Sequence, residues 1–288
     1  MRRASLAVAL LAALATFAAL DACRAADELK VAVGGRGIGE TFVTEVGDKA
    51  GMFKRHNLAL DIFYTDGGGE TQQAVISNSA QVGIASGFLG AIGVFAKGAP
   101  VRIIGGSYSS THAGVLALQR HYNIDFKPVP TGNAAATMTA TMSGQVDVGW
   151  AGAPFGVAEL EAGKTRLIMK SSDAPEFDKQ TSRVIIANAA ELTARADVFV
   201  RFMRGYRDTL AWVYSKPEGL AAYAAFAKLS PETARRALQE FLPAAAVDPD
   251  RISGIEEVMT DAVKFKFISA PLSKEELAEL IRIPERRQ

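Results

Sequence analysis

Hydrophobic and polar positions follow a regular order along the first part of the chain. Short apolar runs predict strands at Leu29–Val33, Ala59–Tyr64, Val82–Ala85 and Val101–Ile104. Between these runs, apolar residues at helical spacing or cap signals predict helices at Glu40–Ala50, Glu70–Ser79 and Phe88–Ala96. Strands that alternate with helices indicate a parallel sheet with helices packed on it. Because such crossovers are right-handed, we expect the strand-to-helix loops to share one edge of that sheet, where ligands of open α/β sheets bind.

One stretch of this pattern occurs twice. Thr71–Ala85 and Thr137–Ala151 match at one constant offset, with Thr, Ala, Ser, Val, Gly and Ala at corresponding positions. Both copies have the pattern of a helix, a tight turn, a buried strand and a loop of small residues. Two such units predict two similar lobes, and a cleft between lobes is a common binding place for small molecules.

The second lobe begins differently, because Gly105–Ser110 leads directly into a helix without a preceding strand. In this half we expect helices at Thr111–Tyr122, Asn133–Ser143 and Phe155–Ala162. We expect strands at Phe126–Val129, Val146–Trp150, Leu167–Lys170 and Arg183–Ala187. From Ala190 onward the pattern is helical throughout, including a capping box at Ser273–Glu276, and these helices are expected to cover the first lobe.

The start of the chain has the pattern of a secretory signal peptide. A basic Met1–Arg3 precedes the uncharged apolar run Leu6–Leu20, and small residues follow it. We expect residues 1–26 to be removed and the mature protein to be periplasmic. Two alternatives stay open: a membrane anchor, for which the run is short, and lipidation at Cys23, because the residues before it resemble a lipobox.

Composition narrows the possible functions further. Lys and Arg number 32 against 31 for Asp and Glu, and this balance gives no indication of a nucleic-acid partner. Cys23 is the only cysteine, so a mature chain without it has no disulfide, thiol nucleophile or cysteine metal site. His112 and His121 share one predicted helix without a carboxylate beside them, so we expect neither a metal nor a cofactor. The mature chain, with about 260 residues, is long enough for one large or two small domains, and we expect a monomer.

The candidate ligand site lies on the loops that follow the strands. Glycines after the first strand have neither dinucleotide-fingerprint nor P-loop spacing, which leaves either a ligand loop whose N–H groups are offered to an acceptor or anion, or a structural turn. Ser86 lacks the spacing of a hydrolase nucleophile and is expected to hydrogen-bond a ligand instead. From the first lobe we expect ligand contacts from Arg36, Gly37, Thr41, Gly68, Gly69, Glu70, Thr71, Ser86 and Gly87. From the second lobe we expect them from Ser110, Thr111, His112, Asn133, Trp150 and Gly152.

Several of these residues have a second interpretation. Arg36 fits a carboxylate or sulfonate, but a lone loop arginine is equally a solvated side chain. Ser110 and its neighbours also have the pattern of a helix N-cap. Trp150 could stack on a planar ligand or fill the core between the lobes. No catalytic residue is expected.

Several stretches of the chain resemble a known family, the substrate-binding proteins of ABC importers. The type that it resembles handles nitrate, sulfonates, taurine and thiamine-precursor pyrimidines. The resemblance rests on Val31–Gly39, Glu45–Leu60 (EVGDKAGMFKRHNLAL), Gly67–Gly87, Val101–Gly106 and Ser143–Pro154, and the part from Ser182 to Ile283 also fits. It implies a class II periplasmic-binding-protein fold, in which two α/β lobes joined by a hinge close on a ligand. It also implies a membrane permease of the ABC type as partner.

The resemblance predicts a shortened second lobe. Family members carry a crossover strand and the first strand of the second lobe after the position of Ser107, and this chain lacks both. We expect residues 27–107 and 188–288 to form the first lobe and residues 108–187 the second. Loss of a buried central strand is expected to cost more than the usual stability of about 5–15 kcal/mol unless something replaces it.

The sequence and the resemblance together favour a non-catalytic protein that captures a small anion or a small aromatic solute for an ABC importer. Two alternatives stay open. One is an enzyme on the same fold, such as a pyrimidine-precursor synthase, although the known versions carry a cysteine-rich motif that this chain lacks. The other is a ligand sensor that docks on a receptor instead of a permease.

Overall fold

The structure is a computed structural model, and it describes residues 25–37, 39–107, 119, 122–170, 173 and 180–286. The predicted signal peptide and its possible lipidation site, Cys23, lie outside the described residues. So do Ser110, Thr111, His112 and most of the helix expected from Thr111 to Tyr122. Among the described residues, no helix is both long and apolar enough to cross a membrane.

A five-stranded sheet forms the centre of the first lobe, with the order β2-β1-β3-β5-β4. Its strands are β1 (Asp27–Gly34), β2 (Leu58–Thr65), β3 (Val82–Gly87), β4 (Val101–Ser107) and β5 (Arg183–Asn188). β1 pairs in parallel with β2 and β3, whereas β5 runs antiparallel between β3 and β4. The sequence prediction of parallel β-α-β units is therefore confirmed for the first strands.

β5 corrects one expectation. The sequence pattern placed the strand Arg183–Ala187 in the second lobe, but it lies in the sheet of the first. A short run with apolar residues on both faces fits any buried strand, so periodicity alone does not identify its partners. The chain leaves this sheet after Ser107 and returns at Arg183, and these two residues are neighbours in the β4–β5 register.

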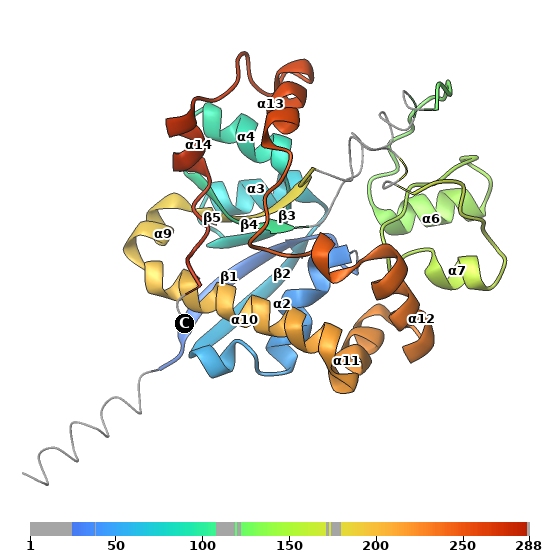
Figure 1. Cartoon of the computed structure of the whole chain (residues 1–288), viewed down its shortest axis with the longest axis horizontal. Helices are drawn as coiled ribbons and strands as arrows, with labels where there is room; N and C mark the ends of the chain where they lie inside the picture. The colour runs from blue at the N-terminus through green and yellow to red at the C-terminus, as the bar shows by residue number, and fades with distance from the viewer. Residues whose placement is uncertain are drawn as a thin grey trace, which may run out of the picture.

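Helices cover both faces of the sheet (Figure 1). One face packs against α2 (Phe42–Lys49), α10 (Ala196–Ser215), α11 (Pro217–Ala227) and α12 (Pro231–Arg236). The other packs against α3 (Gly68–Ile76), α4 (Phe88–Ala96), α13 (Ile255–Lys264) and α14 (Lys274–Leu280). The expectation that the late helices cover the first lobe is confirmed.

The alternation of side chains along the strands produces these two cores. Ile185 of β5 belongs to the core beneath α10, whereas its neighbours Val184 and Ile186 belong to the core beneath α4 and α13. Successive side chains point to opposite faces of a sheet, so a continuous apolar run fills both cores. Aromatic rings add to the first core, where Phe53 stacks on Phe202 with centroids 5.4 Å apart.

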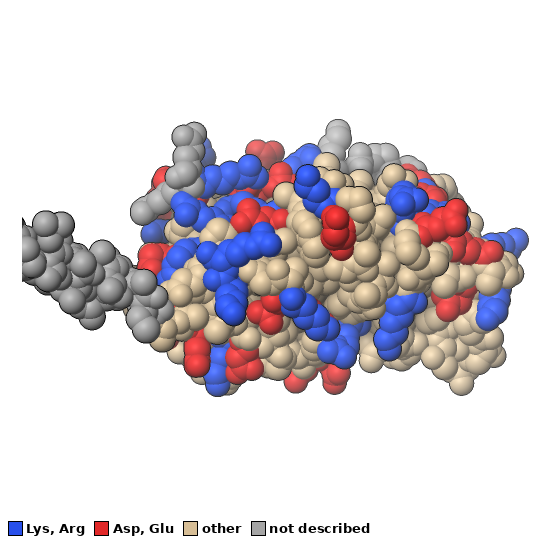
Figure 2. Space-filling view, turned by 90° about the horizontal axis from the view of Figure 1, so that it is seen from below, with Lys and Arg blue, Asp and Glu red and all other residues tan. Residues whose placement is uncertain are grey.

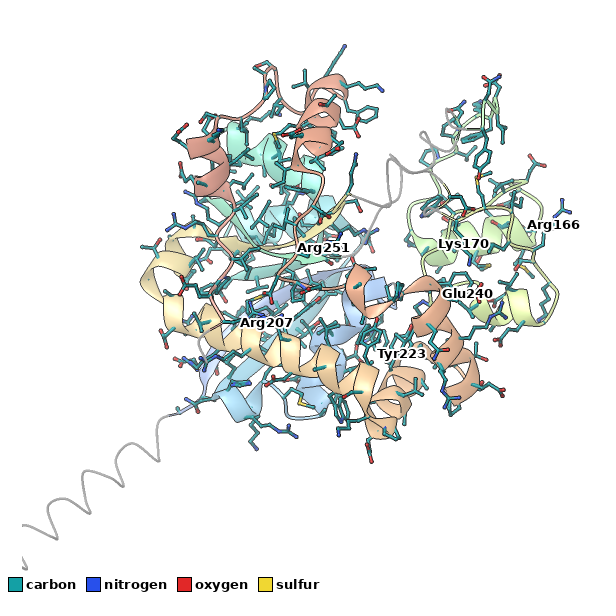
Figure 3. The ribbon with its side chains drawn as sticks, in the orientation of Figure 1. Arg166, Lys170, Arg207, Tyr223, Glu240 and Arg251 are labelled. Carbon is teal, nitrogen blue, oxygen red and sulfur yellow. The ribbon has the colours of Figure 1, made fainter. Side chains whose placement is uncertain are left out.

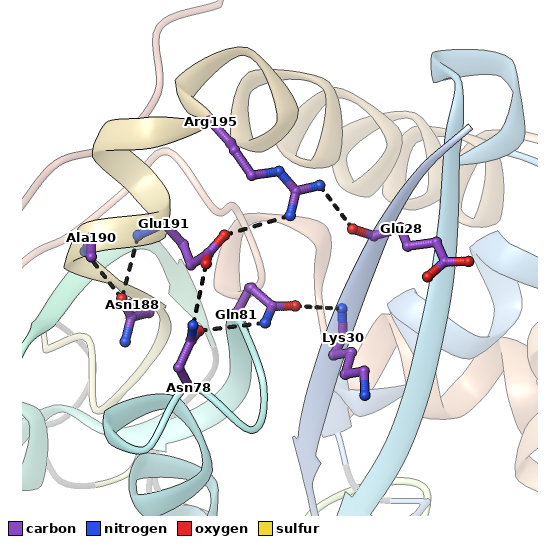
Figure 4. Close-up of polar contacts among 8 residues, drawn as sticks. All are labelled: Glu28, Lys30, Asn78, Gln81, Asn188, Ala190, Glu191 and Arg195. Atoms are coloured by element: carbon purple, nitrogen blue, oxygen red, sulfur yellow. Dashed lines mark hydrogen bonds and ion pairs between the residues drawn. The ribbon is translucent and has the colours of Figure 1, made fainter. Parts of the chain in front are cut away.

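Polar contacts fix the edge of the sheet at which the parallel strands begin (Figure 4). Gln81 accepts a hydrogen bond from the backbone of Lys30 at 2.9 Å. Asn188 caps the short helix α9 (Ala189–Ala194), accepting from the backbone N–H of Ala190 at 3.0 Å. The side chain of Arg195 reaches back to the carbonyl of Glu28 at 2.9 Å. Hydrogen bonds between protein groups occupy this edge of the sheet. The opposite edge is therefore the candidate place for a ligand.

Between β4 and β5 the described residues form α6 (Ala134–Met142) and α7 (Val157–Glu161), and α7 lies beside α12 (Figure 1). Both helices were predicted. No strand forms in residues 122–170, so three strand predictions are wrong: Phe126–Val129, Val146–Trp150 and Leu167–Lys170. A strand requires a neighbour for its N–H and C=O groups, and no strand within residues 122–170 supplies one.

Exposed apolar side chains mark the same segment. They are Tyr122, Ile124, Val129, Met142, Val148, Leu167, Ile168 and Phe267, and all but Phe267 lie in residues 122–170. Val148 reaches 62% exposure, although it was predicted to lie in a buried strand. The apolar residues that would fill the core of a second sheet therefore lie at the surface.

Candidate functional site

The carboxyl ends of β1, β2 and β3 meet at one edge of the sheet, as the sequence predicts. The N-termini of α3 and α4 lie at this edge, next to Gly68 and Gly87. A Cβ atom on Gly68 would lie 3.1 Å from the backbone nitrogen of Gly87 and 3.2 Å from the carbonyl oxygen of Ala85. Glycine therefore allows α3 to approach the end of β3. Gly67, Gly69 and Gly87 have open space beside their α-carbons, with no atom within 4 Å of a Cβ built there.

Buried hydroxyl groups hold these loops together. The hydroxyl groups of Thr65 and Thr71 lie 2.7 Å apart, and Thr71 also donates to the carbonyl of Gly67 at 3.1 Å. Ser86 accepts a hydrogen bond from Gln72 at 2.9 Å, and the same amide donates to the carbonyl of Gly87 at 3.2 Å. Thr71 and Ser86 are fully buried. Their side chains thus position the loops, while a direct contact with ligand stays a prediction for both.

The backbone at the end of β3 adopts a conformation that L-residues rarely take. Ala85 has a φ of 62°, and the β3–β5 register shifts between Gly83 and Ser86. A left-handed alanine costs roughly 1–2 kcal/mol, and strain of this kind is concentrated at functional sites. The register shift interrupts the regular β3–β5 pairing just before Gly87, a residue without a side chain.

The predicted anion-binding residue Arg36 contacts protein groups in this structure. Its guanidinium lies 4.6 Å from the centroid of the Tyr64 ring and 3.5 Å from Glu45. Burial would raise the pKa of Glu45, but hydrogen bonds from Lys49 and Tyr64 and the charge of Arg36 outweigh it, so that pKa is lowered. Arg36 is 70% exposed, and Glu45 keeps Lys49 at 2.6 Å as a second cation.

A buried acid lies beneath this edge, in the 3₁₀ turn η1 (Gly39–Thr41). The Glu40 side chain is 3% exposed, and its Oε1 lies 3.7 Å from Nη1 of Arg183. Burial raises the pKa of the Glu40 carboxyl above its ordinary value, against the lowering effects of Arg183 and Ser107. Tyr206 of α10 packs nearby, and its own pKa is raised by burial and by the Glu40 charge. Ser107 is itself buried, and its hydroxyl lies close enough to the Glu40 carboxyl to lower that pKa.

The Glu40 environment gives a testable pH dependence. A raised folded-state pKa means that burial of Glu40 costs nothing well below pH 4.5, the ordinary pKa in the unfolded chain, because both states are then protonated. As pH rises from there through the folded-state pKa, stability is lost. Glu40→Gln mimics the protonated form, so we expect it to raise the melting temperature by a few degrees at pH 8 and to leave it unchanged at pH 4. Calorimetry at both pH values checks this, and an E40Q protein that melts below the wild type at pH 8 contradicts it.

The segment between β4 and β5 reaches the candidate site through Ala153–Phe155. The backbone N–H of Gly39 donates to the carbonyl of Ala153 at 2.7 Å. A Cβ built on Gly37, whose φ is 78°, would lie 3.6 Å from the Phe155 ring. Ala153 and Val157 are buried in the core beneath α10. The glycine loop after β1 therefore lies against Ala153–Phe155 of the intervening segment, as expected for a site between two lobes.

The other predicted second-lobe residues are less central. Asn133 caps α6 by accepting from the backbone of Ala136 at 2.9 Å, and it is exposed. Trp150 and Gly152 are partly exposed, and Gly152 has open space around its α-carbon. The first-lobe residues Gly68–Thr71, Ser86 and Gly87 come together at the sheet edge, whereas Asn133 does not join them.

Charged side chains join the same segment to α12 and to the π-helical turn η4 (Ala237–Phe241). Glu161 accepts from Thr233 at 2.6 Å and pairs with Arg236 at 3.6 Å, and Lys170 pairs with Glu240 at 3.1 Å. In Figure 3, Lys170 lies across from Glu240. Beside them is a hollow of about 510 Å³, which is lined by Glu161, Glu232, Thr233, Arg235, Arg236, Gln239 and Glu240. The hollow is not lined by any residue of the predicted ligand site.

The described residues do not assemble a metal or hydrolase site. No group of three or more His, Cys, Asp or Glu side chains among them is placed to hold a metal ion. His56 is the histidine within the described part of the chain. It pairs with Asp208 at 2.7 Å and lies just before β2, whereas Ser86 lies at the carboxyl end of β3. On the face seen in Figure 2, basic and acidic side chains are interspersed.

Sequence reasoning missed the residues that organise this edge from below, namely Glu40, Gln72, Ser107 and Arg183. Glu40 follows a strand-end loop, but an acid in a first helical turn is commonly there for the helix dipole. Ser107 and Arg183 are distant in sequence and meet only because β5 enters the first sheet. No local pattern contains that information.

Comparisons with known proteins agree with this geometry. Residues 104–220 match the family model described as NMT1/THI5 like. A comparison with curated protein sequences gives no significant match. The alkanesulfonate-binding protein SsuA from Xanthomonas axonopodis pv. citri shares 14% identity, with 89% of this chain and 98% of that chain covered and a TM-score of 0.66.

Two further solved structures extend the comparison. The periplasmic nitrate-binding protein NrtA from Synechocystis PCC 6803 shares 10% identity, with 88% of this chain and 86% of that chain covered and a TM-score of 0.57. A Candida albicans protein with the generic periplasmic-binding-protein fold shares 13% identity, with 91% and 98% covered and a TM-score of 0.60. The chain therefore has the periplasmic-binding-protein fold, and the resemblance to the NMT1/SsuA-like binding proteins is confirmed.

Proposed function

We propose that this chain is an extracytoplasmic solute-binding protein that captures a small anion or a small aromatic solute and delivers it to an ABC importer. The observation that carries the proposal is the sheet edge at which the loops after β1, β2 and β3 converge. Glycine backbones and helix N-termini lie together there, and Ala153–Phe155 of the intervening segment forms the opposite wall. The neighbours that bind sulfonate and nitrate support this type of ligand.

Export and delivery are part of the same proposal. The apolar run Leu6–Leu20 supports removal of residues 1–26 and a periplasmic location, with lipidation at Cys23 as the variant that retains a tether. An ABC permease is the expected partner, and the protein is expected to act as a monomer. Residues 108–182 would serve as the second lobe, moving against the first at the paired crossings Ser107 and Arg183.

The test is a thermal melt of the chain without its signal peptide, alone and with nitrate, bicarbonate, sulfonates, aromatic carboxylates and pyrimidines. A ligand at 100 times its Kd adds about 2.7 kcal/mol and raises the melting temperature by several degrees. We expect at least one class to do so. A cooperative melt that none of these solutes shifts would contradict this ligand range.

A matched pair of variants locates the site. Gly87 has a φ of −65°, which any L-residue adopts, and no atom lies within 4 Å of a Cβ built on it, so Gly87→Phe adds a ring at the sheet edge. We expect it to abolish the ligand-induced shift while the ligand-free melting temperature changes little. Lys97→Phe adds the same ring at the exposed far end of α4 and should leave the shift intact. Equal shifts in both variants would exclude the edge as the binding place.

A further inference from the structure

A strap of first-lobe backbone crosses the place where the chain leaves the first sheet. The strap is Asp248–Ser253, which connects η5 (Ala244–Ala246) to α13 (Figure 1). The N–H of Gly106, the next-to-last residue of β4, donates to the carbonyl of Pro249 at 2.8 Å. A Cβ atom on Gly106 would lie 2.2 Å from the carbonyl oxygen of Arg251, so a side chain here would push the strap away. The outgoing crossing is therefore bonded to the strap at close range.

The returning crossing is bonded to the same strap. Thr181 lies two residues before β5, and its N–H donates to the carbonyl of Ser253 at 3.0 Å. The N–H of Ser253 donates in turn to the Thr181 hydroxyl at 3.0 Å, and Thr181 is buried. Ser107 and Arg183 are partners in the β4–β5 register, so the two crossings already lie side by side. The strap thus holds both of them at once.

Two arginines fasten the middle of the strap to the first lobe. Asp250 accepts hydrogen bonds from Nε of Arg207 at 2.9 Å and from its Nη2 at 2.6 Å, a two-point contact with helix α10. Arg286 donates to the same carboxylate. Burial would raise the pKa of Asp250, but hydrogen bonds and charges from both arginines outweigh it, so that pKa is lowered. Contacts of this kind are among the stronger polar interactions in proteins.

We propose that the strap Asp248–Ser253 is a third, non-covalent connector at the hinge, which limits the orientations of the intervening segment relative to the first lobe. This rests on the solute-binding function proposed above and adds to it a means of positioning, because that orientation sets how often Ala153–Phe155 faces the glycine loop. The outgoing crossing ends β4, an edge strand of the sheet. The end of an edge strand frays easily without a neighbour on its outer side, and the strap supplies that neighbour.

A purely structural role for the strap has a different consequence. Proteins commonly cover the open edge of a sheet with a loop, and the strap does cover the edge of β4 at Gly106. If that were its whole role, loosening the strap would lower stability and leave the orientation of the intervening segment unchanged. The decisive measurement is therefore orientation in the folded protein.

Distances between two spin labels report this orientation without any solute. The chain without residues 1–26 contains no cysteine. Lys97→Cys after α4 and Lys164→Cys after α7 replace exposed residues, one in the first lobe and one in the intervening segment. Double electron–electron resonance then gives the distribution of label-to-label distances in the ligand-free chain. We expect Asp250→Asn to widen this distribution by about twofold or more, because more orientations become populated when the strap is loose.

A second variant and a control assign the effect to the strap. Thr181→Val keeps the backbone bond to Ser253 and removes the hydroxyl acceptor, so we expect a smaller widening in the same direction. Asp197→Asn removes another aspartate–arginine pair of α10, that with Arg201 at 2.9 Å, and should leave the distribution as in the wild type. Circular dichroism confirms that each variant is folded, and T181V decides the question if D250N does not fold.

The outcomes separate this proposal from the one on which it rests. If D250N and T181V lower the melting temperature but leave the distance distribution unchanged, the strap only covers the edge of β4 and the connector is wrong. If D197N widens the distribution as much as D250N, the effect does not come from the strap and the connector is again wrong. Solute binding is tested separately by the thermal melts, so a widened distribution in a chain that binds no solute supports the connector and contradicts the proposed function.

Discussion

Phe202→Ala is expected to lower the free energy of unfolding by about 3–5 kcal/mol. Phe202 is fully buried on α10, stacks on Phe53 and has Tyr206 at a centroid distance of 6.2 Å. Its ring joins the turn before β2 to the long helix beneath the sheet. Because domains of this kind have a margin of about 5–15 kcal/mol, this single change should remove a large part of the stability.

Urea unfolding followed by circular dichroism measures this loss. Phe267→Ala is the matched control, because that ring is 38% exposed, and we expect it to cost about 1 kcal/mol or less. Equal losses for the two variants would mean that the core beneath α10 is not the main source of stability.

Amide hydrogen exchange is expected to divide the chain in two. In the absence of ligand, amides in 126–129, 146–150 and 167–169 should exchange at least about a thousandfold faster than those of β1, β3 and β5. The first group has no strand ladder, and exposed Val129, Val148 and Leu167 lie within it. The sheet amides are paired and covered by helices on both faces.

The amides of α10 serve as an internal reference, since that helix packs directly on the sheet and should be protected with it. If the amides of the three stretches are as protected as those of α10, these stretches form a second sheet in solution, and the strand-free structure of residues 122–170 is wrong. Restoring a strand after Ser107 should raise protection in these stretches, provided that the missing strand is the cause of their exposure.

The described part of the intervening segment contacts the rest of the chain through ionic pairs and through buried apolar side chains. Glu161, Arg236, Lys170 and Glu240 form an exposed or partly exposed chain of pairs. Surface pairs contribute little individually and are screened by salt. The buried side chains of Ala153 and Val157 thus provide the firmer attachment, and they lie next to the glycine loop of the candidate site.

The local pattern of apolar and polar residues was sufficient to predict most elements of the first lobe. The strands β1–β4 and the helices α2, α3 and α4 were predictable because each contains its own period, and the Ser273 capping box was predictable from four residues. The strand-end loops followed from the topology of parallel units, which places them on one edge. The candidate ligand loops at Gly68–Thr71 and Ser86–Gly87 were accessible to this reasoning for the same reason.

The sequence by itself determined the alternation of strands and helices in the first lobe and the shared edge of its loops, because these depend on neighbours in the chain. Only the tertiary structure decided that β5 joins the first sheet, that three apolar runs remain outside any strand, and that Glu40 meets Ser107 and Arg183. Each of these depends on a partner far away in sequence. An apolar run becomes a strand only where another strand satisfies its backbone, and a buried acid finds its partners only where the fold brings distant segments together.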